Sequence, residues 1–182
     1  MIDRHAMKCA PVLAAMTLFV ALAACDDVKT PASTAEAPAK SVTAAFTHQI
    51  SSDLSGYYIP ATPISVDGYR VKALFLGQGA DFAAWEGGAK SGGFAPVMIE
   101  FEKNGATPIR VLPQTYSVSD GRVRFEGVDP RLGNVAFTGT LDQNALATAR
   151  RNLGDEAPVL TGTLRAGGTA FGHQKFRWYG GD

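Results

Sequence analysis

From Phe46 onward, apolar and polar residues alternate with a period of two, and turn signals divide this pattern into short runs. Successive side chains of a strand point to opposite faces, so this alternation predicts half-buried strands. In Arg122–Glu126, Val123 and Phe125 share one face while the charged residues share the other. Dipeptides that favour the positive φ of tight hairpins separate many of the runs: Asp67-Gly68, Asn104-Gly105, Asp120-Gly121 and Gly167-Gly168.

The alternating runs predict strands at 56–59, 69–78, 82–86, 95–103, 109–118, 122–127, 134–141, 159–165 and 171–179. Short sequential strands with tight turns favour antiparallel meander connections. A sheet of about eight or nine such strands closes naturally into a barrel, which removes exposed edges. We therefore expect an all-β fold with one short helix: a small antiparallel β-barrel or barrel-like sandwich, lipocalin-like or streptavidin-like in general architecture.

The single helix is predicted to follow Asp142, a favourable N-cap, and to stop at Gly154, a favourable C′ residue. Its apolar stripe has helical spacing and consists of Ala145, Leu146, Ala149 and Leu153. Two similar strands flank this helix, and each contains one glycine, Gly139 and Gly162. We interpret these glycines as points that ease local strand curvature.

The beginning of the chain has the pattern of a secretory signal peptide. Arg4 and Lys8 precede an apolar run of 16 residues, Cys9–Ala24. A spanning helix needs about 20 apolar residues, so this run is short for one. Met7-Lys8 makes a more typical leader start than Met1, and either methionine can be the initiator.

The apolar run ends in Leu22-Ala23-Ala24-Cys25, which resembles the lipobox of bacterial lipoproteins. The resemblance implies diacylglycerol on the sulfur of Cys25, cleavage before this cysteine and acylation of its new amine. Each buried CH₂ contributes about 0.8 kcal/mol, so several acyl chains give long-lived anchoring. The alternative is an ordinary signal peptide or anchor helix that contains an incidental cysteine.

Asp26 and Asp27 follow the predicted lipid site. In enteric lipoproteins, an aspartate directly after the cysteine resembles a signal for retention in the inner membrane. Asp26 therefore favours the periplasmic face of the inner membrane, while the alternative is that both aspartates are simply solvated tether residues.

Three parts of the chain follow from these patterns: a lipoprotein signal peptide at 1–24, the lipidated cysteine with a flexible tether at 25–44, and a single β-rich domain at 45–182. The tether is rich in Ala, Pro, Ser and Thr and has no aromatic residue, so it cannot bury enough surface to offset chain entropy. Both cysteines, Cys9 and Cys25, precede the domain. The domain therefore has no thiol for a disulfide, for catalysis or for a metal.

The composition argues against several classes of partner. The formal net charge is +0, which gives no basic face for nucleic acid. The domain has two histidines, His48 and His173, without metal-ligand spacing, so we expect no metal site. The glycine-rich stretch at 86–94 lacks the ending of a phosphate-binding loop. We therefore expect no cofactor.

The domain shows no catalytic constellation. It lacks a Gly-x-Ser-x-Gly motif, and Glu100 and Glu102 lie two apart on one strand face rather than across a cleft. Aromatic pairs give the binding hint, because one member of each adjacent pair, Tyr57-Tyr58 and Trp178-Tyr179, points outward from its strand. The candidate ligand-binding residues are Tyr58, Trp85 and Trp178.

Three functions are consistent with these features. The leading one is a membrane-tethered periplasmic lipoprotein that acts as a non-catalytic binding module of the cell envelope, for an envelope protein or a small ligand. A lipocalin-like carrier would hold an apolar ligand in a barrel cavity lined by Phe75, Phe137 and Phe176. An enzyme acting on cell-wall glycans near Trp85 and Glu86 would need a cleft with two opposed carboxylates.

Overall fold

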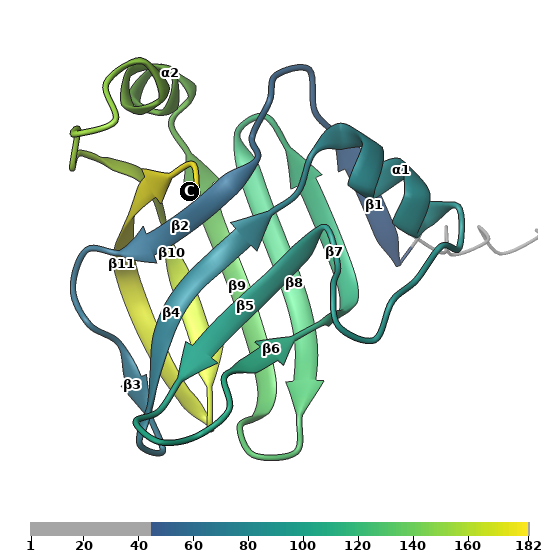
Figure 1. The fold of residues 1–182 in the computed structure, drawn as a ribbon, viewed down its shortest axis with the longest axis vertical. Helices are drawn as coiled ribbons and strands as arrows, with labels where there is room; N and C mark the ends of the chain where they lie inside the picture. Colours follow the sequence, from purple (N-terminus) through teal and green to yellow (C-terminus); the bar gives the residue numbers. More distant parts are fainter. Residues whose placement is uncertain (1–44, 182) are drawn as a thin grey trace, which may run out of the picture. The chain divides into compact units, whose positions relative to one another are not determined.

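A computed structural model of the protein describes residues 45–181. The predictions for the leader, Cys25 and the tether through residue 44 lie outside the described residues. Within 45–181, one strongly curled sheet of eleven strands dominates the fold (Figure 1). None of the helices in this range is long and apolar enough to cross a membrane.

The strands are β1 (Phe46–Gln49), β2 (Gly56–Pro60), β3 (Ser65–Val66), β4 (Tyr69–Leu76), β5 (Val97–Glu102), β6 (Ile109–Val111), β7 (Pro113–Ser119), β8 (Arg122–Asp129), β9 (Gly133–Leu141), β10 (Pro158–Ala166) and β11 (Thr169–Tyr179). The helices in the described range are α1 (Gly79–Glu86) and α2 (Gln143–Arg151). This mostly β, barrel-like architecture confirms the predicted fold class.

The sheet order is β1-β7-β8-β9-β10-β11-β2-β4-β5-β6, and β3 pairs with β4 beside this path. Strands β7 to β11 form the expected antiparallel meander, and β11 then pairs antiparallel with β2, with Trp178 opposite Tyr58. β1 pairs with β7 in parallel. Leu112 alone separates β6 from β7, although these strands lie near opposite ends of the sheet path, so the predicted strand at 109–118 is two strands.

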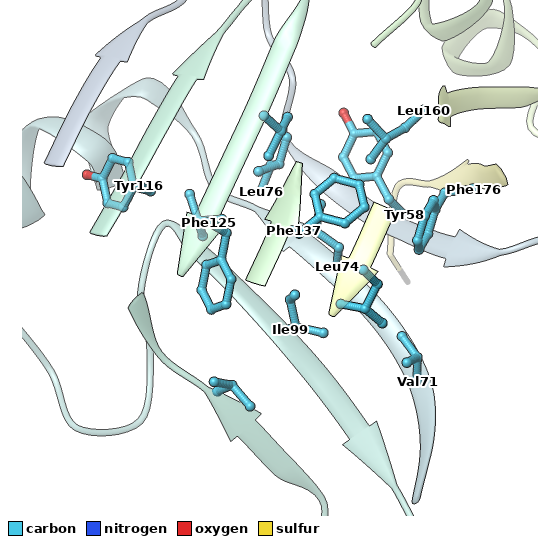
Figure 2. Close-up of a cluster of buried hydrophobic side chains, with 14 of the residues drawn as sticks. Tyr58, Val71, Leu74, Leu76, Ile99, Tyr116, Phe125, Phe137, Leu160 and Phe176 are labelled. Carbon is cyan, nitrogen blue, oxygen red and sulfur yellow. The ribbon is translucent and has the colours of Figure 1, made fainter. Parts of the chain in front are cut away.

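The concave side of the sheet holds one hydrophobic core (Figure 2). β8 supplies the predicted inward residues, Val123 and Phe125, and its other face is exposed along the whole strand. Phe137 and Phe176 are both buried in this core, where their rings meet edge to face at a centroid distance of 5.4 Å. The inward aromatic side chains therefore pack against one another.

Gly139 and Gly162 are paired across β9 and β10, beneath the ring of Phe137. A Cβ on Gly139 would lie 2.7 Å from that ring, and one on Gly162 would lie 2.6 Å from it. Real Cβ atoms do not approach so closely, so these glycines make room for a large core side chain.

Helix α1 corrects the predicted strand at 82–86 and adds a second helix to the one expected. The Asp81 carboxylate accepts a hydrogen bond from the backbone N–H of Gln78 at 2.8 Å, which satisfies a donor at the helix start. Phe82 and Trp85 are the buried residues of this helix. Their spacing of three places both on one helical face, which the period-two interpretation overlooked.

Helix α2 confirms the predicted helix and its N-cap. The Asp142 carboxylate accepts hydrogen bonds from the backbone N–H groups of Asn144 and Ala145 at 2.9 and 3.0 Å. The helix ends earlier than predicted, because Asn152 leaves it with an extended backbone, φ −125°. Gly154 is therefore not its C′ residue, and Leu153, 83% exposed, does not belong to the buried stripe.

Candidate functional site

A β-bulge in β4 determines which side chains reach the outer face of the sheet. The register against β5 pairs Val71 with Phe101 and Ala73 with Glu100, so one extra residue lies between the two pairs. The bulge shifts the alternation by one position, and Phe75 points outward instead of sharing the inner face with Val71. The expectation that Phe75 lines the barrel interior is therefore wrong.

Four outward rings form a continuous group that we call the aromatic row: Tyr57, Phe75, Phe94 and Tyr179. Register places Tyr179 opposite Tyr57 and Tyr57 opposite Phe75, on three neighbouring strands. The Tyr179–Tyr57, Tyr57–Phe75 and Phe75–Phe94 centroid distances are 6.4, 5.1 and 5.6 Å. Phe94 and Tyr179 remain 40% and 41% exposed, so the row presents apolar surface to the outside.

Beside the aromatic row lies a charged cluster of Lys72, Glu100 and Arg110. Glu100 is only 4% exposed although it points outward from β5. Its carboxylate accepts a hydrogen bond from Arg110 Nε at 2.9 Å and lies 3.4 Å from Lys72 Nζ. Arg110 Nη1 also donates to the Gly93 carbonyl at 3.5 Å. Both cations are more than half exposed, so their other donors face solvent.

Three rings of the aromatic row, Tyr57, Phe75 and Tyr179, line one cavity of about 740 Å³ together with the charged cluster, and we call this cavity the outer-face pocket. Its remaining rim includes Gln78 and Asp81 at the start of α1 and Gly180 and Gly181 after β11. The volume lies within the range of about 300–1,000 Å³ that is usual for sites of small ligands. Its wall combines aromatic rings with several converging polar and charged groups, and such polar groups fix the orientation of a ligand in sites of this kind.

Tyr58, one of the predicted ligand residues, is part of the core rather than the pocket. Its side chain is fully buried, and its hydroxyl donates to the Leu54 carbonyl at 2.7 Å. Burial raises the pKa of the Tyr58 hydroxyl well above its usual value. The outward member of this aromatic pair is Tyr57.

Trp178 is half-buried against the core, and Tyr179 is the outward member of that pair. The indole Nε1 of Trp178 donates to the Ser55 carbonyl at 3.0 Å, and the Arg150 guanidinium lies 5.0 Å from the ring centroid. One member of each adjacent aromatic pair points outward as expected, but these members are Tyr57 and Tyr179, which the sequence alone does not distinguish from Tyr58 and Trp178.

Trp85, the third predicted residue, lies in α1 and does not line the outer-face pocket. It is buried, its ring meets Phe46 edge to face at 6.1 Å, and Lys90 Nζ lies 5.7 Å from its ring centroid. Within 45–181 its indole Nε1 has no hydrogen-bond partner. The three predicted residues therefore do not form one site.

A second polar cluster joins α1 to β1 and β7. The Glu86 carboxylate lies 2.9 Å from His48 Nδ1 and accepts a hydrogen bond from the Tyr116 hydroxyl at 3.0 Å. Burial, with the hydrogen bond and charge of Glu86, raises the pKa of Tyr116 well above its usual value. The partners that Glu86 has in the described part of the chain are thus a histidine and a tyrosine rather than a second carboxylate.

Among residues 45–181, no three His, Cys, Asp or Glu side chains lie close enough together to hold a metal ion.

Comparison of the chain with models of known protein families, with curated proteins and with solved structures finds no match.

Proposed function

We propose that the protein is a lipid-anchored binding module of the cell envelope, without catalytic activity, whose ligand occupies the outer-face pocket. The resemblance of Leu22-Ala23-Ala24-Cys25 to a lipobox supports an anchor at Cys25, and Asp26 favours the periplasmic face of the inner membrane. The tether then holds the domain close to the bilayer.

The side chains that line the outer-face pocket support the proposal that it binds a ligand. Glu100 is a buried carboxylate on an outward strand face, and the rings of Tyr57 and Phe75 lie beside it. A sheet face that meets only water needs neither feature, since exposed strand positions usually carry small polar or charged residues. An apolar surface rimmed by polar groups is instead typical of binding sites.

Replacement of the lipid site, Cys25→Ser, tests the anchor. The wild-type protein should incorporate labelled palmitate and sediment with membranes, because acyl chains hold it there. The variant should incorporate no label and should lose its membrane association. Persistent labelling of the variant would contradict the lipobox interpretation.

A thermal-shift measurement on the detergent-solubilised full chain tests the pocket. The low-molecular-mass fraction of an envelope extract should raise the melting temperature, because a ligand that binds only the folded state stabilises it. Tyr57→Ala should remove this rise, and the control Val128→Ala, at an exposed position outside the pocket, should keep it. An equal rise in both variants, or no rise in the wild type, would contradict the proposed site.

A further inference from the structure

The charges around the outer-face pocket are balanced. Its charged lining residues are two cations, Lys72 and Arg110, and two carboxylates, Glu100 and Asp81. Each carboxylate already has a donor, since Arg110 donates to Glu100 and the backbone N–H of Gln78 donates to Asp81. The lining therefore has no surplus charge to attract an anion or a cation.

Donors and acceptors nevertheless alternate along this lining. The ammonium of Lys72 and the guanidinium of Arg110 can only donate, whereas the carboxylate of Glu100 between them can only accept. A hydroxyl group both donates and accepts, so neighbouring hydroxyls can satisfy both kinds of group without carrying charge. This favours a neutral ligand with several hydroxyl groups.

Besides hydroxyl groups, the ligand needs an apolar surface, because the aromatic row forms part of the same pocket. Three ring-to-ring contacts join Tyr179, Tyr57, Phe75 and Phe94 in sequence. Inside the pocket, the Tyr179–Tyr57 and Tyr57–Phe75 centroid distances of 6.4 and 5.1 Å already make the row longer than a single six-membered ring. The ligand must therefore combine C–H faces with hydroxyl edges and repeat along a chain, which describes a saccharide chain of pyranose rings.

The position of the pocket disfavours an extended peptide. The pocket lies on the face of β2, β4 and β5, whose pairing with their neighbours occupies the backbone groups. A peptide that adds as a strand needs a free sheet edge, whereas the aromatic row lies on paired strands and only Arg110 of the lining comes from β6, at the end of the sheet path. A proline-rich peptide, which docks on aromatic grooves, is the rival that the experiment must exclude.

We propose that the outer-face pocket binds a neutral oligosaccharide of hexose or N-acetylhexosamine units. Sugar rings lie against Tyr57 and Phe75, and their hydroxyls bond to the exposed donors of Lys72 and Arg110. This assignment rests on the proposed function, because it names the ligand class of the same pocket.

The test uses the full chain in a zwitterionic detergent, since sugar-headed detergents would compete. Maltotetraose, cellotetraose and tetra-N-acetylchitotetraose are titrated by calorimetry, and saturation-transfer NMR identifies the protons that touch the protein. At least one oligosaccharide should bind saturably, with the strongest transfer to C–H protons. A proline-rich decapeptide is titrated in parallel and should not bind.

Variants then locate the binding. Tyr57→Ala and Phe75→Ala should each weaken saccharide binding at least tenfold, because each removes a stacking surface. If the substitution of a half-buried ring impairs folding, Tyr179→Ser tests the same surface at a position that is 41% exposed. Val128→Ala should leave the affinity unchanged.

The outcomes separate this assignment from the function on which it rests. If no oligosaccharide binds, or only the decapeptide binds, the saccharide assignment is wrong, while protection by the envelope extract still supports the pocket. Saccharide binding that survives Tyr57→Ala and Tyr179→Ser also overturns the assignment, because the sugar then occupies another surface. Loss of both extract protection and saccharide binding in the wild type overturns both proposals.

Discussion

Strands β8 and β5 belong to the same sheet, yet their outer faces differ in burial. Along β8, buried and exposed residues alternate from end to end, and the outward residues include Arg124 and Glu126. In β5, the first five residues are all buried, so Met98 and Glu100 are covered on the outer side as well. Clean alternation is typical of a strand whose outer face meets water, whereas burial on both faces shows that other side chains cover the outer face of the strand as well.

The contrast also separates two uses of aromatic residues. On the inner face, Phe125 and Phe137 fill the core and contribute to stability. On the outer face, Tyr57 and Phe75 leave part of their rings open to the pocket. This division between core aromatics and pocket aromatics can be tested by substitutions that change one face of the sheet and leave the other face intact.

The largest effect is expected on the inner face of β9. Phe137→Ala removes a fully buried ring and should lower the free energy of unfolding by about 3–5 kcal/mol. Thr138→Ala, at the next and outward position, should change it by less than about 0.5 kcal/mol. Urea unfolding followed by tryptophan fluorescence measures both values, and similar losses would contradict the assignment of faces.

A smaller effect is expected for the buried carboxylate of the outer face. Glu100→Gln leaves Lys72 and Arg110 without their shared anion and should cost about 1–2 kcal/mol, limited because both cations can return to water. The matched change on the water-facing strand, Glu126→Gln, should cost less than about 0.5 kcal/mol. Equal values in urea unfolding would show that β5 and β8 do not differ in this respect.

The smallest effect concerns Asp129, a buried carboxylate at the end of β8. The Arg131 side chain and backbone N–H donate to it, and these hydrogen bonds hold its pKa below the usual value. A lowered folded-state pKa stabilises the protein above the unfolded-state pKa of about 4, and this stabilisation is lost as the pH falls through the folded-state value.

Asp129→Asn should therefore cost about 1 kcal/mol at neutral pH, and the difference from the wild type should shrink as the pH falls below about 4. Urea titrations across this pH range measure the difference. A gap that stays constant with pH would show that the charge of Asp129 does not contribute.

The sequence predicted those parts of the fold in which local pattern and tertiary structure agree. The alternation of β8 and the Asp142 cap of α2 needed no distant contact to be recognised. The sequence pattern predicted a strand in place of helix α1, because the helix is short and two buried residues, Phe82 and Trp85, are too few to establish a helical period. The capping interaction between Gln78 and Asp81 was the available signal.

The outer-face pocket depends on features that no local pattern contains. A single bulge decides whether Phe75 points inward or outward, because every residue after it changes face. Tyr57 and Tyr179 become neighbours only through the pairing of β2 with β11. The sequence offered two aromatic pairs, and only the register of that strand pair selects which members face the pocket.

The pairing of β2 with β11 also has a consequence for the order in which the domain can assemble. The hydrogen bond from Trp178 to Ser55 spans 123 positions of sequence, and contacts of such separation form slowly because a long loop must close first. The hairpins within β7 to β11 can form earlier, since their partners are adjacent. The wall of the outer-face pocket at Tyr179 therefore forms only when the sheet closes, so the pocket is complete only late in the assembly of the domain.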